Sequence, residues 1–196
     1  KVICKLINGK ARSLIASWGY PSYRTDQVWD GLYQKYWHLP DQFSALPKAF
    51  RSQLSTFFGK PEMDGSLTQL LPDQIIQSSD GETIKTLFSL IDQRAVEAVL
   101  MRYEKRRTLC ISTPAGGAMG CVFCATGQMG FRRHLTSGEI VEQVLYYARQ
   151  LAEKSEQVTN IVFMGMGEPF HNYDQTMAAI DRLNHPQGYN IGARRM

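Results

Sequence analysis

The chain has 196 residues, a formal net charge of +4, 43% hydrophobic residues and 20% charged residues, values typical of a globular protein with one sizeable core or two small domains. No apolar run approaches the length that spans a membrane, and the N-terminus lacks the layout of a signal peptide. Four cysteines are too few for a disulfide scaffold of this size, so we expect a cytoplasmic protein whose two closely spaced thiols serve metal chemistry.

Residues 1–60 are predicted to be helical. Thr25 is the expected N-cap of one helix, and Pro47 lies in the first turn of the next. Apolar residues recur at helical spacing after these signals: Val28, Leu32 and Tyr36, then Phe50, Leu54 and Phe57. The many aromatic residues of this segment fit a hydrophobic core better than a surface that stacks bases.

Residues 66–113 change to an alternating pattern that predicts a meander of β-hairpins. The expected strands are Gln74–Ser78, Thr83–Leu90, Ala95–Arg102 and Thr108–Thr113. Asp80-Gly81 is a strong turn signal between the first two strands. The last strand leads directly into a glycine-rich loop that carries two cysteines.

Beyond this loop the pattern becomes strand and helix in alternation. Thr136 and Glu139 have capping-box spacing at the start of an amphipathic helix. Val158–Met164 is a short apolar run typical of a buried parallel strand, Asp174 is placed to cap a second helix, and another strand is expected from Tyr189. The sequence therefore predicts an α/β fold with a boundary near residues 59–66, which divides it into domains at 1–60 and 61–196.

Cys121 and Cys124 are the first candidate site. Two thiols separated by two residues on a glycine-rich loop suit a metal or an iron–sulfur cluster. A zinc site needs two further ligands at matching spacing, and the four histidines are isolated from one another. This favours an iron–sulfur cluster over half a zinc site or two buried thiols.

Gly165–Pro169 is the second candidate site, because it directly follows the predicted buried strand. Ligands in α/β folds bind at the carboxyl ends of strands, where glycine lets the backbone approach them closely. Glu168 could accept hydrogen bonds from a ligand ammonium group. The alternative is an ordinary turn between a strand and a helix.

Glu97 is unusual as a carboxylate in an otherwise apolar strand. A four-residue loop at Arg102–Lys105 would pair Glu97 directly with Cys110, where the carboxylate could accept the thiol proton. A slip of one residue in the strand register would put the two side chains on opposite faces.

Three basic clusters could contact phosphate or could simply be solvated loops. They are Lys105–Arg107, Arg132–His134 and Arg194-Arg195.

Three segments together resemble the RlmN/Cfr family of radical-SAM RNA methyltransferases, which methylate adenine in ribosomal RNA and transfer RNA. They are Ala95–Met101, Arg107–Phe131 and Asn160–Pro169. The resemblance implies a helical accessory RNA-binding-like domain, a β-meander and the first part of a partial (β/α) barrel. It also implies a [4Fe–4S] cluster, S-adenosyl-L-methionine (SAM), an external electron donor and a monomer.

The resemblance also assigns expected roles to individual residues. Cys121 and Cys124 match the second and third cluster ligands. Gly167 and Glu168 match the SAM-contacting motif. Glu97 matches a proposed proton acceptor, and Cys110 matches the cysteine that resolves the covalent enzyme–RNA intermediate.

Two departures from the family pattern bear on activity. The first cluster cysteine of the family falls at Gly117, and Pro114 stands where glutamine is usual. The barrel of the family also continues past Met196, where it carries the methyl-bearing cysteine. These 196 residues alone are therefore expected to be inactive. The alternatives are a degenerate copy that retains RNA binding and a zinc-binding RNA module, and methylation at adenine C2 is not distinguished from methylation at C8.

Overall fold

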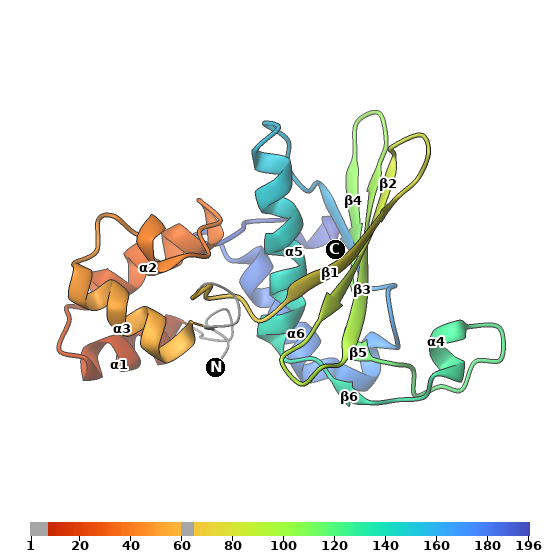
Figure 1. The fold of residues 1–196 in the computed structure, drawn as a ribbon, viewed down its shortest axis with the longest axis horizontal. Coiled ribbons are helices and arrows are strands. Elements are labelled where there is room, and N and C mark those ends of the chain that lie inside the picture. The colour runs from red at the N-terminus through yellow and green to blue at the C-terminus, as the bar shows by residue number, and fades with distance from the viewer. Residues whose placement is uncertain (1–7, 60–64) are drawn as a thin grey trace.

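The computed structural model describes residues 8–59 and 65–196 (Figure 1). Three helices come first: α1 (Asn8–Ser17), α2 (Tyr23–Tyr33) and α3 (Lys48–Phe58), with a short 3-10 helix η2 (Pro40–Gln42) before α3. The strands are β1 (Leu71–Gln77), β2 (Thr83–Ser89), β3 (Ala95–Arg102), β4 (Arg107–Cys110), β5 (Pro114–Ala115), β6 (Arg133–His134) and β7 (Asn160–Val162). The remaining helices are α4 (Ala125–Gln128), α5 (Ser137–Ala152), η4 (Pro169–Asn172), α6 (Tyr173–Asn184) and η5 (Ala193–Arg195). The predicted mixed α/β architecture is confirmed.

The three N-terminal helices pack around the predicted aromatic-rich core. Val28, Leu32, Phe50 and Leu54 are buried, as their spacing predicts. The expected boundaries of the first of these helices were wrong, because α2 begins at Tyr23 and ends before Tyr36. Thr25 thus lies inside the helix rather than at its N-cap.

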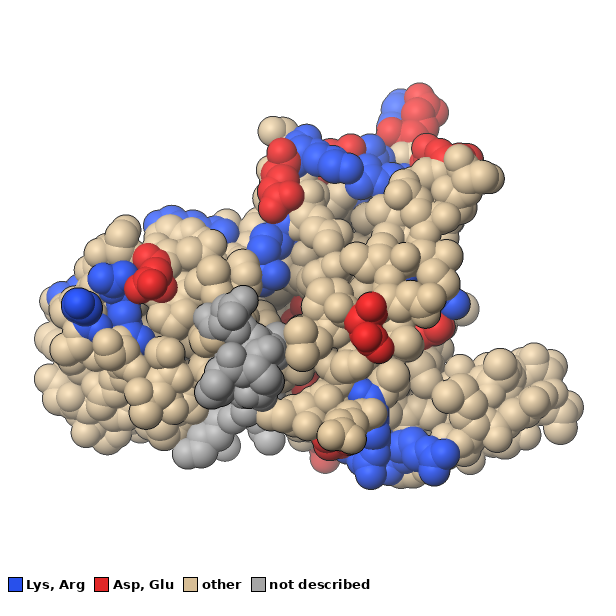
Figure 2. Space-filling model, in the orientation of Figure 1, with Lys and Arg blue, Asp and Glu red and all other residues tan. Residues whose placement is uncertain are grey.

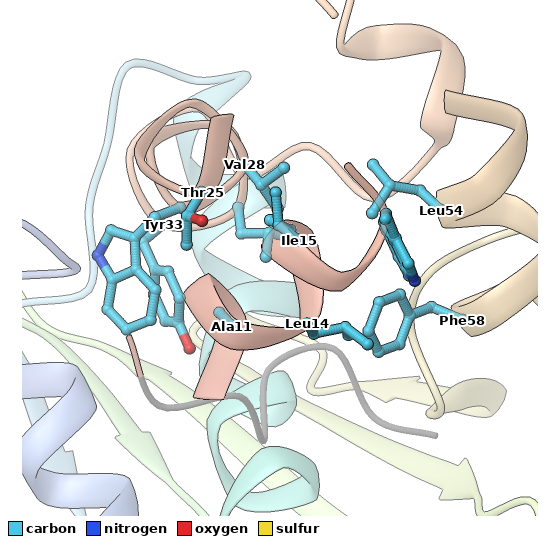
Figure 3. A pocket seen from close by; sticks show the side chains of 11 residues that line it. Ala11, Leu14, Ile15, Thr25, Val28, Tyr33, Leu54 and Phe58 are labelled. Carbon is cyan, nitrogen blue, oxygen red and sulfur yellow. The ribbon is translucent and has the colours of Figure 1, made fainter. Parts of the chain in front are cut away.

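Thr25 is buried, and its hydroxyl oxygen has no hydrogen-bond partner. It lines a small cavity of about 20 Å³ among apolar side chains from all three helices (Figure 3). Thr25→Val replaces an unsatisfied hydroxyl by a methyl group of similar size, so we expect it to raise the free energy of unfolding by about 1 kcal/mol in urea titrations. Thr56→Val on α3, where the hydroxyl donates to the Ser52 carbonyl oxygen, is the control and is expected to give no gain. A loss of stability in Thr25→Val would contradict this account.

The main sheet has the strand order β1-β2-β3-β4-β7, antiparallel except for the parallel pair β4 and β7. Val96, Ala98 and Leu100 alternate along β3 and are buried on the face that α5 covers. The Tyr147 hydroxyl of α5 donates to the Ala98 carbonyl oxygen at 3.1 Å. The intervening residues of β3 face the other way and are partly exposed, so this face of the sheet is open.

The strand predicted from Tyr189 is absent, since this described segment forms a turn followed by η5. Its backbone is held by the end of α6 rather than by β7. The Ile191 amide donates to the Leu183 carbonyl oxygen, and the Asn184 side chain donates to the Ile191 carbonyl oxygen. These bonds explain why Ile191, an apolar residue of the predicted strand, is buried although the segment forms no strand.

The helical segment is joined to the α/β segment by specific contacts. Trp29 donates to the Gln187 carbonyl oxygen, and Arg149 of α5 donates to the Tyr36 carbonyl oxygen, both at 2.9 Å. The predicted boundary falls largely on residues 60–64, which lie outside the described part of the chain, so the division into two domains stays a prediction. No helix among the described residues is long and apolar enough to cross a bilayer.

Glu142 of α5 is a buried carboxyl group close to this junction. Its Oε2 accepts from the Gln69 amide at 2.7 Å, whereas Oε1 has no partner. Burial is the largest influence and raises the pKa of Glu142 to about 8. The folded state therefore favours the protonated form, because desolvation penalises the charge.

This shift predicts a pH-dependent stability. Because folding raises the pKa of Glu142, the free energy of unfolding is highest below the unfolded-state pKa near 4.5, where the carboxyl is protonated in both states. The free energy of unfolding then falls as the pH rises to about 8. We expect Glu142→Gln to gain on the order of 3 kcal/mol over the wild type between pH 5 and pH 8, measured by urea unfolding. Glu153→Gln, at the exposed end of α5, is the control. Parallel pH profiles for the wild type and Glu142→Gln would show that the carboxyl does not titrate in this range.

Candidate cofactor site

The open face of the sheet carries Glu97 and Cys110, but they do not pair directly. Strands β3 and β4 align Val99 with Cys110 and Met101 with Thr108. The Tyr103 amide donates to the Arg106 carbonyl oxygen, so the hairpin turn contains two residues rather than the predicted four. The predicted register was wrong by two residues. An even shift keeps both side chains on one face, as diagonal neighbours roughly 7–8 Å apart.

Lys85 is a polar residue of this face that the sequence analysis missed. Its Nζ lies 3.2 Å from Glu97 Oε1, and both side chains are about two-fifths exposed. Lys85 pairs with Val99 across the strands, which makes it the diagonal neighbour of Glu97. The alternation of β2 and the Asp80-Gly81 turn could have placed this lysine on the open face.

Cys110 is half-buried beside the end of β7. Burial raises the pKa of its thiol, and a contact with the Met164 amide offsets this only in part. The folded protein therefore holds Cys110 as a neutral thiol, and its conversion to thiolate requires a proton acceptor.

The cysteine loop, residues 116–132, projects from the sheet between β5 and β6 (Figure 1). Its base is fixed by backbone bonds from Arg132 to Ala115 and from Leu135 to Thr113, each 3.0 Å long. Arg133 also forms a bidentate ion pair with buried Glu139, in which its two terminal nitrogens lie 2.8 and 3.0 Å from the two carboxylate oxygens. The chain has no charged residue between Arg107 and Arg132, and the projecting lobe is uncharged in Figure 2. Residues 116–131 therefore offer no side-chain charge to a phosphate, and the only charge of the loop is exposed Arg132 at its base.

Cys124 is the N-cap residue of α4 and lies one turn after Cys121. Its thiol contacts the backbone amides of Gly127 and Thr126, and these contacts lower its pKa. The Cys124 amide donates to the Cys121 carbonyl oxygen at 3.1 Å, which closes the turn between the cysteines. Amide contacts favour the thiolate, the form of cysteine that binds metal.

A side chain at position 117 would point toward the peptide group between Thr126 and Gly127. A Cβ atom on Gly117 would lie 3.2 Å from the Thr126 carbonyl oxygen and 3.3 Å from the Gly127 nitrogen. A Cβ atom on Gly127 would in turn lie 2.8 Å from the Cys121 carbonyl oxygen. Positions 117, 121 and 124 therefore converge around Gly127, where the absence of a side chain permits their close approach.

The Gly165–Glu168 loop lies against the base of the cysteine loop. Gly167 has a φ of +74°, and a Cβ atom on it would lie 2.0 Å from the Pro114 ring and 3.0 Å from the Gly116 carbonyl oxygen. Glu168 is partly buried and accepts a hydrogen bond from the Phe170 amide at 3.2 Å. The two candidate sites are therefore adjacent at the carboxyl ends of β4 and β7.

No family model matches the chain. A probable dual-specificity RNA methyltransferase RlmN from Chloroflexus aurantiacus is 45% identical over 188 residues, covering 93% of this chain and 48% of that protein. A ribosomal RNA large subunit methyltransferase N from Nitrosopumilus maritimus is 40% identical, covering 97% of this chain and 54% of that protein. The crystal structure of a radical SAM methyltransferase from Sphaerobacter thermophilus matches with a TM-score of 0.92 and 43% identity, covering 99% of this chain and 55% of that one.

The chain belongs to the RlmN/Cfr family. It spans about half the length of the curated relatives it matches. The similarity to the Sphaerobacter structure extends over nearly the whole chain and confirms the predicted fold class. The site residues carried over from the RlmN/Cfr pattern remain predictions.

Radical-SAM proteins of the RlmN/Cfr type use SAM and a [4Fe–4S] cluster. In the residues described here, no three His, Cys, Asp or Glu side chains group closely enough to hold a metal ion. The cysteine loop supplies two thiols, and Gly117 supplies none at the third converging position. The residues present therefore do not fit a cluster held by three cysteines, although the backbone that would support it is arranged around Gly127.

Proposed function

We propose that the chain serves in the SAM-dependent methylation of adenine C2 in ribosomal RNA and transfer RNA in the cytoplasm. The observation that carries the proposal is the identity of 45% with proteins named dual-specificity RNA methyltransferase RlmN, over 93% of this chain. The adjacency of the cysteine loop and the Gly165–Glu168 loop supports it, because both lie at the strand ends where α/β folds bind ligands.

The proposal assigns a role to each candidate residue. Cys121 and Cys124 would be two of three cluster ligands once position 117 carries a thiol, and such a cluster would take its electron from an external donor. Gly167 allows close approach of SAM, and the Glu168 carboxylate accepts hydrogen bonds from the SAM ammonium group. On the open face, Glu97 is the proton acceptor, held by Lys85, and Cys110 is the thiol that resolves the enzyme–RNA intermediate.

A second candidate function is that of a degenerate copy that binds RNA without methylating it. Gly117 favours this alternative, because it removes one of three converging ligand positions. RNA affinity that depends on phosphate contacts is expected to fall steeply as salt concentration rises.

Adenine methylation in a chimera distinguishes the two functions. Residues 1–196 are joined to the C-terminal half of the Chloroflexus relative, with either Gly117 or Gly117→Cys, and C2-methyladenine is measured in RNA after anaerobic reconstitution. Methylation only with Gly117→Cys supports a methyltransferase scaffold that has lost one ligand. Methylation with Gly117 as well refutes the degenerate copy. No methylation by either chimera, with a cluster present, refutes the methyltransferase assignment.

A further inference from the structure

Ser112 is the residue at which the candidate segments meet. It is fully buried two residues after the end of β4, and the cysteine loop begins a few residues later. Its hydroxyl donates to the Glu97 carbonyl oxygen at 2.6 Å and accepts from the Met166 amide at 2.8 Å. One hydroxyl group therefore joins β3, the start of the cysteine loop and the Gly165–Glu168 loop.

Gln143 of α5 fixes the backbone of Ser112. Its Oε1 accepts from the Ser112 amide and its Nε2 donates to the Ser112 carbonyl oxygen, both at 2.9 Å. Gln143 is fully buried on the side of α5 that packs into the protein. A primary amide can both donate and accept, so this side chain satisfies both backbone groups of a residue that has left the β-ladder.

We propose that Ser112 and Gln143 are positioning residues that hold the Gly165–Glu168 loop in a fixed place relative to the cysteine loop and Glu97. The remaining direct bonds between these segments include a Gly165-to-Ile111 bond of 3.1 Å and a longer Thr113-to-Met166 bond of 3.4 Å. Loss of the Ser112 hydroxyl leaves the buried Met166 amide without its partner, and the loop opens more readily. The consequence for SAM binding rests on the proposed function, whereas the consequence for the loop does not.

Amide hydrogen exchange at Met166, measured by NMR on the purified chain, tests the proposal. Ser112→Ala is expected to speed exchange at Met166 about tenfold, the effect of losing one buried hydrogen bond. Gln143→Met keeps the side-chain volume, loses both amide bonds, and is expected to speed exchange at the same site. Tyr147→Phe is the matched control, because it removes a buried hydroxyl that bonds to Thr86 and Ala98, away from the loops.

The expected pattern is faster exchange at Met166 in Ser112→Ala and Gln143→Met but not in Tyr147→Phe. Exchange at the wild-type rate in either folded positioning variant, or an equal effect in Tyr147→Phe, would overturn the proposal. Equilibrium dialysis with SAM tests the proposed function separately from the positioning role. If the reconstituted Gly117→Cys protein fails to bind SAM while Met166 exchange responds as expected, the proposed function fails and the positioning role stands.

Discussion

Gly117→Cys is expected to raise the iron retained after anaerobic reconstitution to about four atoms per chain, well above the wild-type content. The added Cβ points at the Gly127 amide, which also contacts the Cys124 thiol. Its contacts of 3.2–3.3 Å are tight, so the first turn of α4 must shift by a few tenths of an ångström. Iron and sulfide analysis of the reconstituted protein measures the effect.

Ala118→Cys is the control for this gain. It adds a thiol one residue away, at an exposed position, and should leave iron retention at the wild-type level. An equal rise in both variants would mean that any extra thiol on the loop suffices, and that the convergence at Gly127 has no special role. Stoichiometric zinc in the wild type would instead favour a zinc-binding RNA module.

Arg133→Met is expected to lower the free energy of unfolding by about 3 kcal/mol, because it leaves the Glu139 carboxylate buried without its cation. The Glu139 side chain is 4% exposed, and its two oxygens both accept from Arg133. The cationic form of Arg133 is strongly favoured, since the hydrogen bonds to Glu139 raise its pKa. Urea unfolding at neutral pH measures the loss.

Arg12→Met is the matched control, because Arg12 pairs with Asp26 at the protein surface, on the N-terminal helices and away from Arg133. Exposed ion pairs contribute about 0–1 kcal/mol, so this variant should be nearly as stable as the wild type. Similar small losses in both variants would contradict the view that the Arg133–Glu139 pair fixes the base of the cysteine loop.

The sequence predicted local features well where the signal and its partner lie close together. The capping box of α5 is confirmed: Thr136 Oγ1 accepts from the Glu139 amide, and Glu139 Oε2 accepts from the Thr136 amide. The Asp80-Gly81 turn is also confirmed, with Gly81 at a φ of +75°. Both depend on residues within a few positions of one another, where side-chain chemistry decides the backbone conformation.

Features that depend on distant residues could not be predicted in the same way. The turn after β3 contains Glu104 and Lys105 and has no glycine, asparagine or proline to fix its length, which is why the predicted register of Glu97 and Cys110 was wrong. The Gln143–Ser112 contact joins residues 31 positions apart, and a lone glutamine on a helix gives no sign of its partner. The resemblance to a family supplied Gly117 as a lost ligand position, whereas its convergence with Cys124 required the structure.

The EPR spectrum of the reduced, reconstituted Gly117→Cys protein, with and without SAM, tests most directly whether the cysteine loop and the Gly165–Glu168 loop form one site. We predict that SAM changes the spectrum, and that adding Glu168→Ala removes the change while preserving the SAM-free signal. A cluster that forms normally and does not respond to SAM would contradict a shared site.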